Sequence, residues 1–172
     1  AGKHAYQFPV GAKGFYLDLG YAFNGAFVAE EHEVNGNTVS GWITSKTTCG
    51  AGKYKLFYYL EIGENVSWKD AGEHKLIATL QSGITTAGIN IALSSVSVTA
   101  AKSSINKNAF AAVKAQSRED WNTNLSKIAV NGDLESAKLF YSLLYRTMQS
   151  PYVISEIDGS YRNTKGEALK DK

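Results

Sequence analysis

Residues 151–163, PYVISEIDGSYRN, gather most of the residue types that could do chemistry into one short polar segment. If Gly159 were the sixth residue of an EF-hand calcium loop, Glu156 and Asp158 would stand at ligand positions three and five. The first and last ligands would then be Ile154 and Lys165, and neither has a carboxylate. The segment therefore does not predict an EF-hand.

The two acids of this segment are two residues apart, so in an extended chain they lie on one side, roughly 6 to 7 Å apart. Inverting glycosidases hold two carboxyl groups about 6.5 to 9.5 Å apart, because the attacking water must fit between them. The spacing favours a more ordinary pair of solvated surface acids. Taken alone, Glu156 and Asp158 leave three interpretations open: an acid–base pair, a sugar contact and a simple turn.

The histidines, the cysteine, the serines and the glycine-rich stretches of the sequence do not fall into known catalytic or metal-binding motifs. His4, His32 and His74 fall on separate predicted strands without HExxH or a similar metal spacing, and Cys49 has no partner at zinc spacing. The chain has no GxSxG elbow, and CGAGK is not a P-loop because GxxxxGKS or GxxxxGKT is missing. These patterns predict no metal site, serine nucleophile or phosphate loop.

The composition sets the class of protein. The chain has 172 residues, 44% of them hydrophobic, which suffices for one domain or one domain with an appendage. Eighteen basic and 16 acidic residues are spread along it, so no basic face for nucleic acid or a membrane surface is expected. No apolar run approaches the roughly 20 residues of a membrane span, and these 172 residues contain no charged segment followed by an apolar one in the pattern of a signal peptide.

The first hundred residues predict an antiparallel β-sandwich, because short runs rich in aromatic and β-branched residues alternate with turn residues and no helical period intervenes. Asn35-Gly36 predicts a type I′ hairpin turn with positive φ at both residues. The seven predicted strands cover residues 4–10, 14–23, 26–34, 38–46, 54–63, 74–81 and 88–99.

After residue 100 the period becomes helical. One long helix is predicted over 103–128, and Asp133 is placed to cap a second helix over 134–150, which Pro151 ends. The second helix carries an apolar stripe that nothing in the last 20 residues is expected to cover. That stripe consists of Ala137, Phe140, Tyr141, Leu144 and Met148.

Residues 121–163 resemble glycoside hydrolase family 92, the calcium-dependent α-mannosidases, where an N-terminal β-sandwich joins an (α/α)6 catalytic barrel. A weaker similarity covers most of the earlier strands. The residues that carry the resemblance are Trp121, Ile128, Val130, Gly132, Phe140, Tyr141, Leu144, Tyr145, Pro151, Glu156, Asp158, Gly159, Tyr161 and Arg162.

The resemblance implies an architecture of three parts. Residues 1–104 would form a β-sandwich that is incomplete at its N-terminus, and 105–132 a linker helix with a short strand. Residues 133–172 would begin the helical catalytic domain, so the bare stripe would belong to the first barrel helix. The chain would then be a fragment of a longer enzyme.

The resemblance also implies a function for that enzyme: removal of terminal α-linked mannose, α-1,2-linked in particular, from glycans by an inverting, calcium-dependent reaction. The family's catalytic acid, base and calcium ligands come from segments that lie beyond Lys172, so no catalytic residue or metal ligand is assigned here and the piece alone is expected to be inactive. Mannose-containing glycans and the rest of the barrel are the expected partners, and the expected location is periplasmic or extracellular.

Four residues of the acidic segment are the predicted substrate contacts: Glu156, Asp158, Gly159 and Tyr161. A carboxylate accepts hydrogen bonds from neighbouring sugar hydroxyls, and a glycine lets the backbone come close. The family usually has Asp where this chain has Glu156, which is one methylene longer. The alternative function is a free-standing carbohydrate-binding or structural β-sandwich without catalytic activity.

Overall fold

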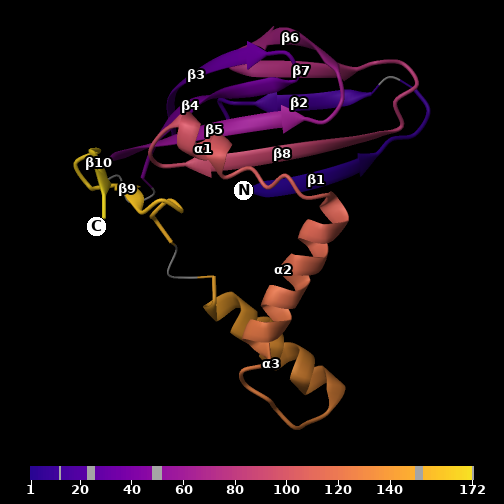
Figure 1. Ribbon diagram of the computed structural model, residues 1–172, viewed down its shortest axis with the longest axis vertical. Coiled ribbons are helices and arrows are strands. Elements are labelled where there is room, and N and C mark those ends of the chain that lie inside the picture. Colours follow the sequence, from indigo (N-terminus) through magenta and orange to yellow (C-terminus); the bar gives the residue numbers. More distant parts are fainter. Residues whose placement is uncertain (12, 23–25, 48–51, 150–152, 172) are drawn as a thin grey trace. The chain divides into compact units, whose positions relative to one another are not determined.

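The computed structural model divides the protein into two compact units, one of which is built from two separate stretches of chain (Figure 1). Ala1–Lys107 and Ser155–Lys172 form the sandwich unit, and Asn108–Ile154 form the helical unit. Cys49 and Pro151 lie outside the residues that the structure describes. The described residues are 1–11, 13–22, 26–47, 52–149 and 153–171.

Two antiparallel sheets face each other in the sandwich unit, which confirms the predicted sandwich. The five-stranded sheet has the order β1 (Gly2–Gln7), β8 (Thr86–Ser94), β5 (Lys53–Ile62), β4 (Thr38–Lys46) and β3 (Phe27–Asn35). The three-stranded sheet has the order β2 (Gly14–Asp18), β7 (Lys75–Leu80) and β6 (Val66–Gly72).

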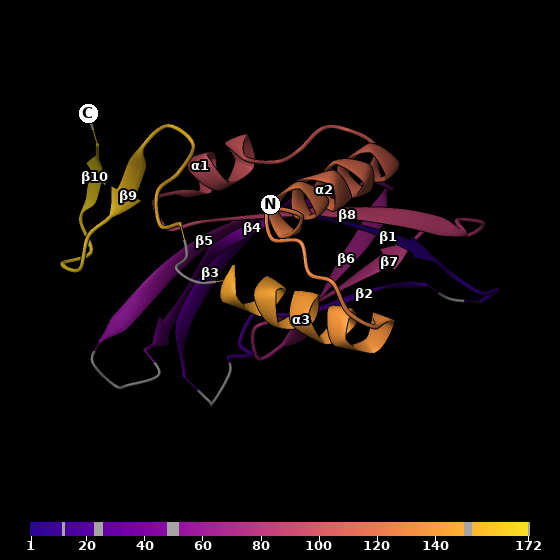
Figure 2. The ribbon, with the colours of Figure 1, turned by 90° about the horizontal axis from the view of Figure 1, so that it is seen from below.

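The core lies between these sheets because alternate residues of facing strands point inward. Ile62 on β5 and Val39 on β4 have no exposed surface, and β7 contributes Leu76 and Leu80 from the other sheet. The opposite, outer face of the five-stranded sheet is partly covered by a short helix, α1 (Val98–Ser103), which contacts β5 and β8 (Figure 2). The middle strands are therefore shielded on two sides.

The predicted strand over 88–99 is too long. It stops at Ser94, whose hydroxyl accepts hydrogen bonds from the backbone N–H groups of Val96 (2.9 Å) and Ser97 (3.3 Å). Ser97 then caps α1 by accepting from the Ala100 N–H at 3.0 Å. Serine hydroxyls that compete for backbone donors thus convert the end of a strand into the start of a helix.

The helix predicted over 103–128 forms but is shorter: it is α2 (Phe110–Leu125), and Ser103 is instead the last residue of α1. At the end of α1 the hydroxyls of Ser103 and Ser104 bond the carbonyls of Ala100 and Ala101. The predicted short strand does not form, since residues 126–133 have turns, bends and irregular backbone.

The turn between β3 and β4 occurs where it is expected, but in another register. Asn35 pairs with Thr38, so Gly36 and Asn37 are the central residues. Gly36 has φ +57° and Asn37 has a negative φ, which is the type II′ pattern of signs and not type I′. Tertiary bonds fix this register: Trp68 Nε1 donates to the Gly36 carbonyl at 2.8 Å, and Ile62 N to the Asn37 carbonyl at 2.9 Å.

The helical unit contains α2 and α3 (Leu134–Thr147). Asp133 caps α3 as predicted, accepting from the N–H groups of Glu135 and Ser136 at 3.0 Å each. The Trp121 and Tyr145 rings lie 4.5 Å apart, yet no described residue of either helix is buried. Of the described helices, none combines the length and the apolar character that crossing a membrane requires.

Candidate functional site

The C-terminal part of residues 151–163 leads into a small β-hairpin that belongs to the sandwich unit. Its strands are β9 (Ser160–Arg162) and β10 (Ala168–Lys170), which pair in antiparallel fashion. Residues 156–159, here called the acidic loop, precede β9. The Gly159 N–H donates to the Glu156 carbonyl at 3.0 Å, and the Glu156 N–H donates to the Ser160 carbonyl at 2.7 Å. The loop is therefore a turn, and the extended geometry assumed for the two acids is wrong.

Asp158 is the more exposed acid, with 59% of its side chain accessible. Its Oδ1 accepts from the Ser160 hydroxyl and, at 3.0 Å, from the Ser160 N–H; its Oδ2 accepts from Lys170 Nζ at 3.3 Å. These bonds, those from Ser160 first, lower the pKa of Asp158 to about 2. Asp158 is consequently an ionised acceptor across the working range of most enzymes, with lone pairs left for a ligand.

Replacing Ser160 with alanine should raise the pKa of Asp158 towards the ordinary aspartate value of about 3.9, because the Ser160 hydroxyl bond, the largest cause of the lowered pKa, is lost while the backbone N–H bond stays. The depressed folded pKa means that the carboxylate stabilises the hairpin fully above about pH 4, and that this contribution is lost as the pH falls through about 2. A carboxyl-carbon NMR titration measures the shift. Lys165→Ala, on the exposed turn of the same hairpin, should leave it unchanged.

Gly159 has φ +82°, a conformation that L residues with a side chain adopt at a cost of roughly 1–2 kcal/mol. Its carbonyl accepts from the Asp171 N–H at 3.1 Å, so the left-handed residue ties the loop to the end of the hairpin. The backbone of the turn therefore requires a glycine at this position.

Gly159→Ala should speed hydrogen exchange of the Asp171 amide about 5- to 30-fold, which corresponds to that conformational cost. Gly63→Ala is the matched control, because the nearest atom to its added Cβ would be 3.7 Å away and its φ is not left-handed. Equal exchange rates in the two variants would contradict the requirement for glycine at position 159.

The carboxylate of Glu156 binds other partners than the carboxylate of Asp158. Its Oε1 accepts from the Ser94 hydroxyl at 2.6 Å and from the Ser95 N–H at 3.1 Å, at the end of β8. Tyr161 lies half-buried on β9, paired with Leu169 and bridged to Ser155. The four predicted contacts thus share one hairpin, but the two carboxylates bind different partners and do not form a pair.

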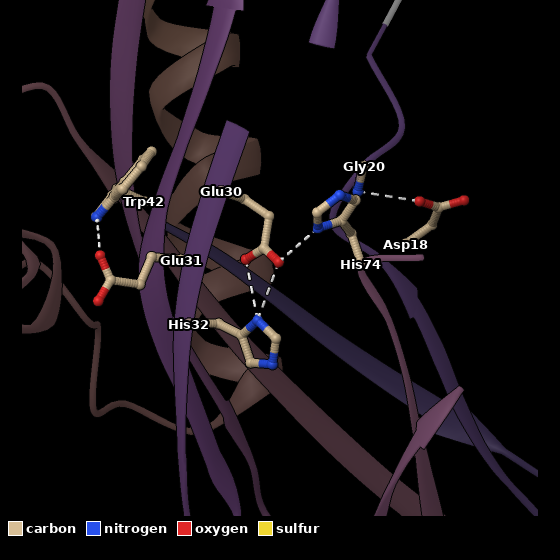
Figure 3. Close-up of polar contacts among 7 residues, drawn as sticks. All are labelled: Asp18, Gly20, Glu30, Glu31, His32, Trp42 and His74. Carbon is tan, nitrogen blue, oxygen red and sulfur yellow. Dashed lines mark hydrogen bonds and ion pairs between the residues drawn. The ribbon is translucent and has the colours of Figure 1, made fainter. Parts of the chain in front are cut away.

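A second polar cluster was not predicted and lies where the two sheets meet (Figure 3). Glu30 of β3 has only 5% of its side chain exposed, and its two oxygens each lie 3.0 Å from a histidine Nδ1, that of His32 and that of His74. His74 belongs to the turn between β6 and β7, so one buried carboxylate joins both sheets. Because carboxylate oxygens accept, each Nδ1–H donates.

The turn that carries His74 is strained. Gly72 pairs with Lys75, leaving Glu73 and His74 as its central residues, and both have positive φ, +49° and +64°. This is the type I′ pattern without glycine, at a cost of roughly 1–2 kcal/mol per residue. The bond to Glu30 and the tilted contact of the His74 ring with the Phe27 ring, with centroids 4.9 Å apart, hold the turn in place.

Glu30 also affects the interior. Burial raises the pKa of Tyr58, and the nearby charge of Glu30 raises it further. Across the residues that the structure describes, no three histidine, cysteine, aspartate or glutamate side chains are arranged to hold a metal ion. The bonds of Glu30 to His32 and His74 link the two sheets. Glu30 and His74 are 44 residues apart in sequence, so no local motif indicates this contact.

Comparison with known proteins finds one matching family model and several solved structures with a similar fold. The glycosyl hydrolase family 92 catalytic domain matches residues 98–172. The structure of the GH92 family glycosyl hydrolase ccman5 superposes with a TM-score of 0.85 and 22% identity, covering 98% of this chain and 26% of that one. The family GH92 α-mannosidase BT3965 from Bacteroides thetaiotaomicron, also solved with mannoimidazole, gives 0.70 and 15%, covering 82% of this chain and 22% of that one. No curated protein matches the sequence.

The chain thus spans about a quarter of the length of the solved structures that it matches. The matched segment begins at Val98, the first residue of α1, upstream of the boundary at 133 predicted for the catalytic domain; the three-part division stays a prediction. The segment includes the acidic loop and the residues 121–163 that carry the resemblance. Residues 98–172 therefore match the glycosyl hydrolase family 92 catalytic domain, and the chain shares the fold of the solved family 92 structures.

Proposed function

We propose that this chain is part of a glycosidase that removes terminal α-linked mannose, α-1,2-linked in particular, from glycans. The observation that carries the proposal is the acidic loop: it lies inside the catalytic-domain match and presents an ionised, half-exposed carboxylate beside a left-handed glycine. Two of the solved structures with this fold are of a family 92 α-mannosidase, and one of them contains mannoimidazole.

In this proposal the loop binds the terminal sugar. Asp158 accepts hydrogen bonds from two neighbouring hydroxyls of one mannose ring, since charge-assisted bonds of this kind combine strength with orientation. Gly159 allows the sugar close to the backbone, and Tyr161 flanks it from β9. Glu156, with Oε1 bonded to Ser94 and Ser95, supports the contact by its position.

The reaction is proposed to invert the anomeric configuration and to need calcium. Among the described residues, no three histidine, cysteine, aspartate or glutamate side chains are arranged to hold a metal ion. We assign the calcium ligands and the catalytic acid and base to the rest of the barrel, as the resemblance to family 92 implies. The 172-residue piece alone is proposed to be inactive, and the parent enzyme to work in the periplasm or outside the cell.

The test uses the full-length protein that contains this chain. It should release mannose from α-1,2-linked mannobiose, leave a β-linked mannoside intact and lose activity with a calcium chelator, regaining it when calcium is added back. NMR of the first product should show the β-anomer, as inversion requires. Release of the α-anomer, or activity that chelation leaves unchanged, would overturn the proposed mechanism; glycan binding without hydrolysis would favour the non-catalytic module.

A further inference from the structure

The junction between β8 and α1 has polar backbone groups that neither the sheet nor the helix uses. Residues 95 and 96 lie between the last residue of β8 and the cap of α1. The Ser95 N–H donates to Glu156, and the carbonyls of Ser95 and Val96 accept from Arg162. Backbone groups at this half-buried junction need partners, and the hairpin supplies them.

Glu156 supplies the acceptor. It bonds Ser94, which is 3% exposed, and through that hydroxyl it joins the bonds from Ser94 to the N–H groups of Val96 and Ser97. A charge-assisted hydroxyl bond of 2.6 Å on a buried serine is a strong, directional attachment. The start of the acidic loop is therefore fixed to the end of β8.

Arg162 supplies the donors. Its Nε donates to the Ser95 carbonyl, its Nη2 to the Val96 carbonyl at 2.9 Å, and its Nη1 to the Gly166 carbonyl in the turn of its own hairpin. The guanidinium carbon lies 5.6 Å from the centroid of the Phe57 ring. A planar fork can make all of these contacts at once, whereas a lysine ammonium cannot reproduce them.

The contacts of Glu156 and Arg162 lie next to each other on the outer face of the five-stranded sheet. Phe57 of β5 pairs directly with Ser94 of β8, so the ring beneath Arg162 and the hydroxyl beneath Glu156 are cross-strand neighbours. Asp158 and Gly159 lie between the two attached residues in the chain. The loop is consequently held at both ends by the sandwich unit.

We propose that Glu156 and Arg162 are positioning residues: they seat the acidic loop on the β8–α1 junction, and the sandwich thereby sets the orientation in which Asp158 meets the sugar. This inference rests on the proposed function. It gives the sandwich a direct part in substrate recognition without any sandwich strand touching substrate, and it makes the length of the Glu156 side chain the reach needed to bond Ser94.

The test compares disruptive with conservative variants in the full-length protein. Glu156→Leu and Arg162→Met should each lower kcat/KM on α-1,2-linked mannobiose about 10- to 100-fold, the effect of misplacing a binding group by about 1 Å. Glu156→Gln, whose amide oxygen can still accept from Ser94 and Ser95, should stay within about threefold of wild type. Lys165→Ala on the same hairpin is the control that should change nothing.

A double-mutant cycle separates positioning from direct sugar contact. If Glu156 acts through Ser94, Ser94→Ala and Glu156→Leu should be non-additive, the double variant being about as impaired as Glu156→Leu alone. Additive losses would mean that Glu156 acts on the sugar independently and would overturn the positioning role. Hydrogen exchange over residues 155–171 should quicken in Glu156→Leu and Arg162→Met and remain unchanged in Lys165→Ala.

The outcomes distinguish this inference from the function on which it rests. A wild-type protein without mannosidase activity overturns the proposed function, and the positioning role falls with it. An active wild type whose Glu156→Leu and Arg162→Met variants keep normal kinetics overturns the positioning role alone. Unchanged exchange in folded variants overturns the attachment itself, whatever the kinetics show.

Discussion

Asp158→Ala in the full-length enzyme should lower kcat/KM on α-1,2-linked mannobiose about 100-fold. Hydrogen bonds to a charged group contribute about 1.5–3 kcal/mol each, and a loss of about 2.7 kcal/mol of transition-state stabilisation is a factor of about 100. The side chain is 59% exposed and held ionised by Ser160 and Lys170, so its acceptor strength is available to substrate at neutral pH. Steady-state kinetics measure the effect.

Two controls separate the lost sugar contact from damage to the loop. Ser160→Ala removes the hydroxyl donor to Asp158 but keeps the backbone N–H donor and the carboxylate, and should lower kcat/KM by less than Asp158→Ala. Asp158→Asn keeps the shape and one acceptor oxygen and should fall between the two. If Asp158→Ala shows wild-type kinetics, the loop does not bind the sugar.

Ile62→Ala should destabilise the sandwich unit by about 2–5 kcal/mol, the usual cost of such a truncation in a filled core. Ile62 has no exposed surface and packs in a cluster with Leu60, Ala78 and Leu80 from both sheets, so the lost methyl groups leave a cavity that strands on two sides cannot easily close. Urea denaturation measures the change. The fluorescence of Trp42 and Trp68 reports on this unit.

Leu93→Ala is the comparison for Ile62→Ala. Leu93 lies on β8 of the same sheet but is 52% exposed, so its truncation should cost less than about 1 kcal/mol. Comparable losses in the two variants would show that the space between the sheets is not the main source of stability.

The sequence predicts those parts of the fold that depend on neighbours in the chain. Asp133 caps α3 because the donors that it accepts from are two and three residues away. Most strands follow from alternation in aromatic and β-branched runs. β6, VSWKDAG, was missed because it has only two large apolar residues among polar and small ones, and it exists by pairing with β7.

The sequence predicts the acidic loop but not the contacts that hold it, because these contacts join residues that are distant in the chain. The acidic loop is a local motif, and its glycine and acids indicate a polar turn. What Glu156 and Arg162 do depends on Ser94, Ser95 and Val96, more than 60 residues earlier in the chain, where the sheet brings them together. Nothing in the spacing of His32 and His74 indicates Glu30 as their shared partner, because inter-sheet packing decides it.

The return of the chain to the sandwich also orders events during synthesis. Glu156 emerges from the ribosome 62 residues after Ser94, a delay of about 3 to 12 s at about 5 to 20 residues per second. The eight strands can pair and close their core within that interval, since their own contacts need nothing downstream. The backbone groups of the β8–α1 junction therefore stay hydrated until α2, α3 and the segment that contains Glu156 and Arg162 have been synthesised. Translation itself would make the attachment of the acidic loop the final step in folding this part of the enzyme.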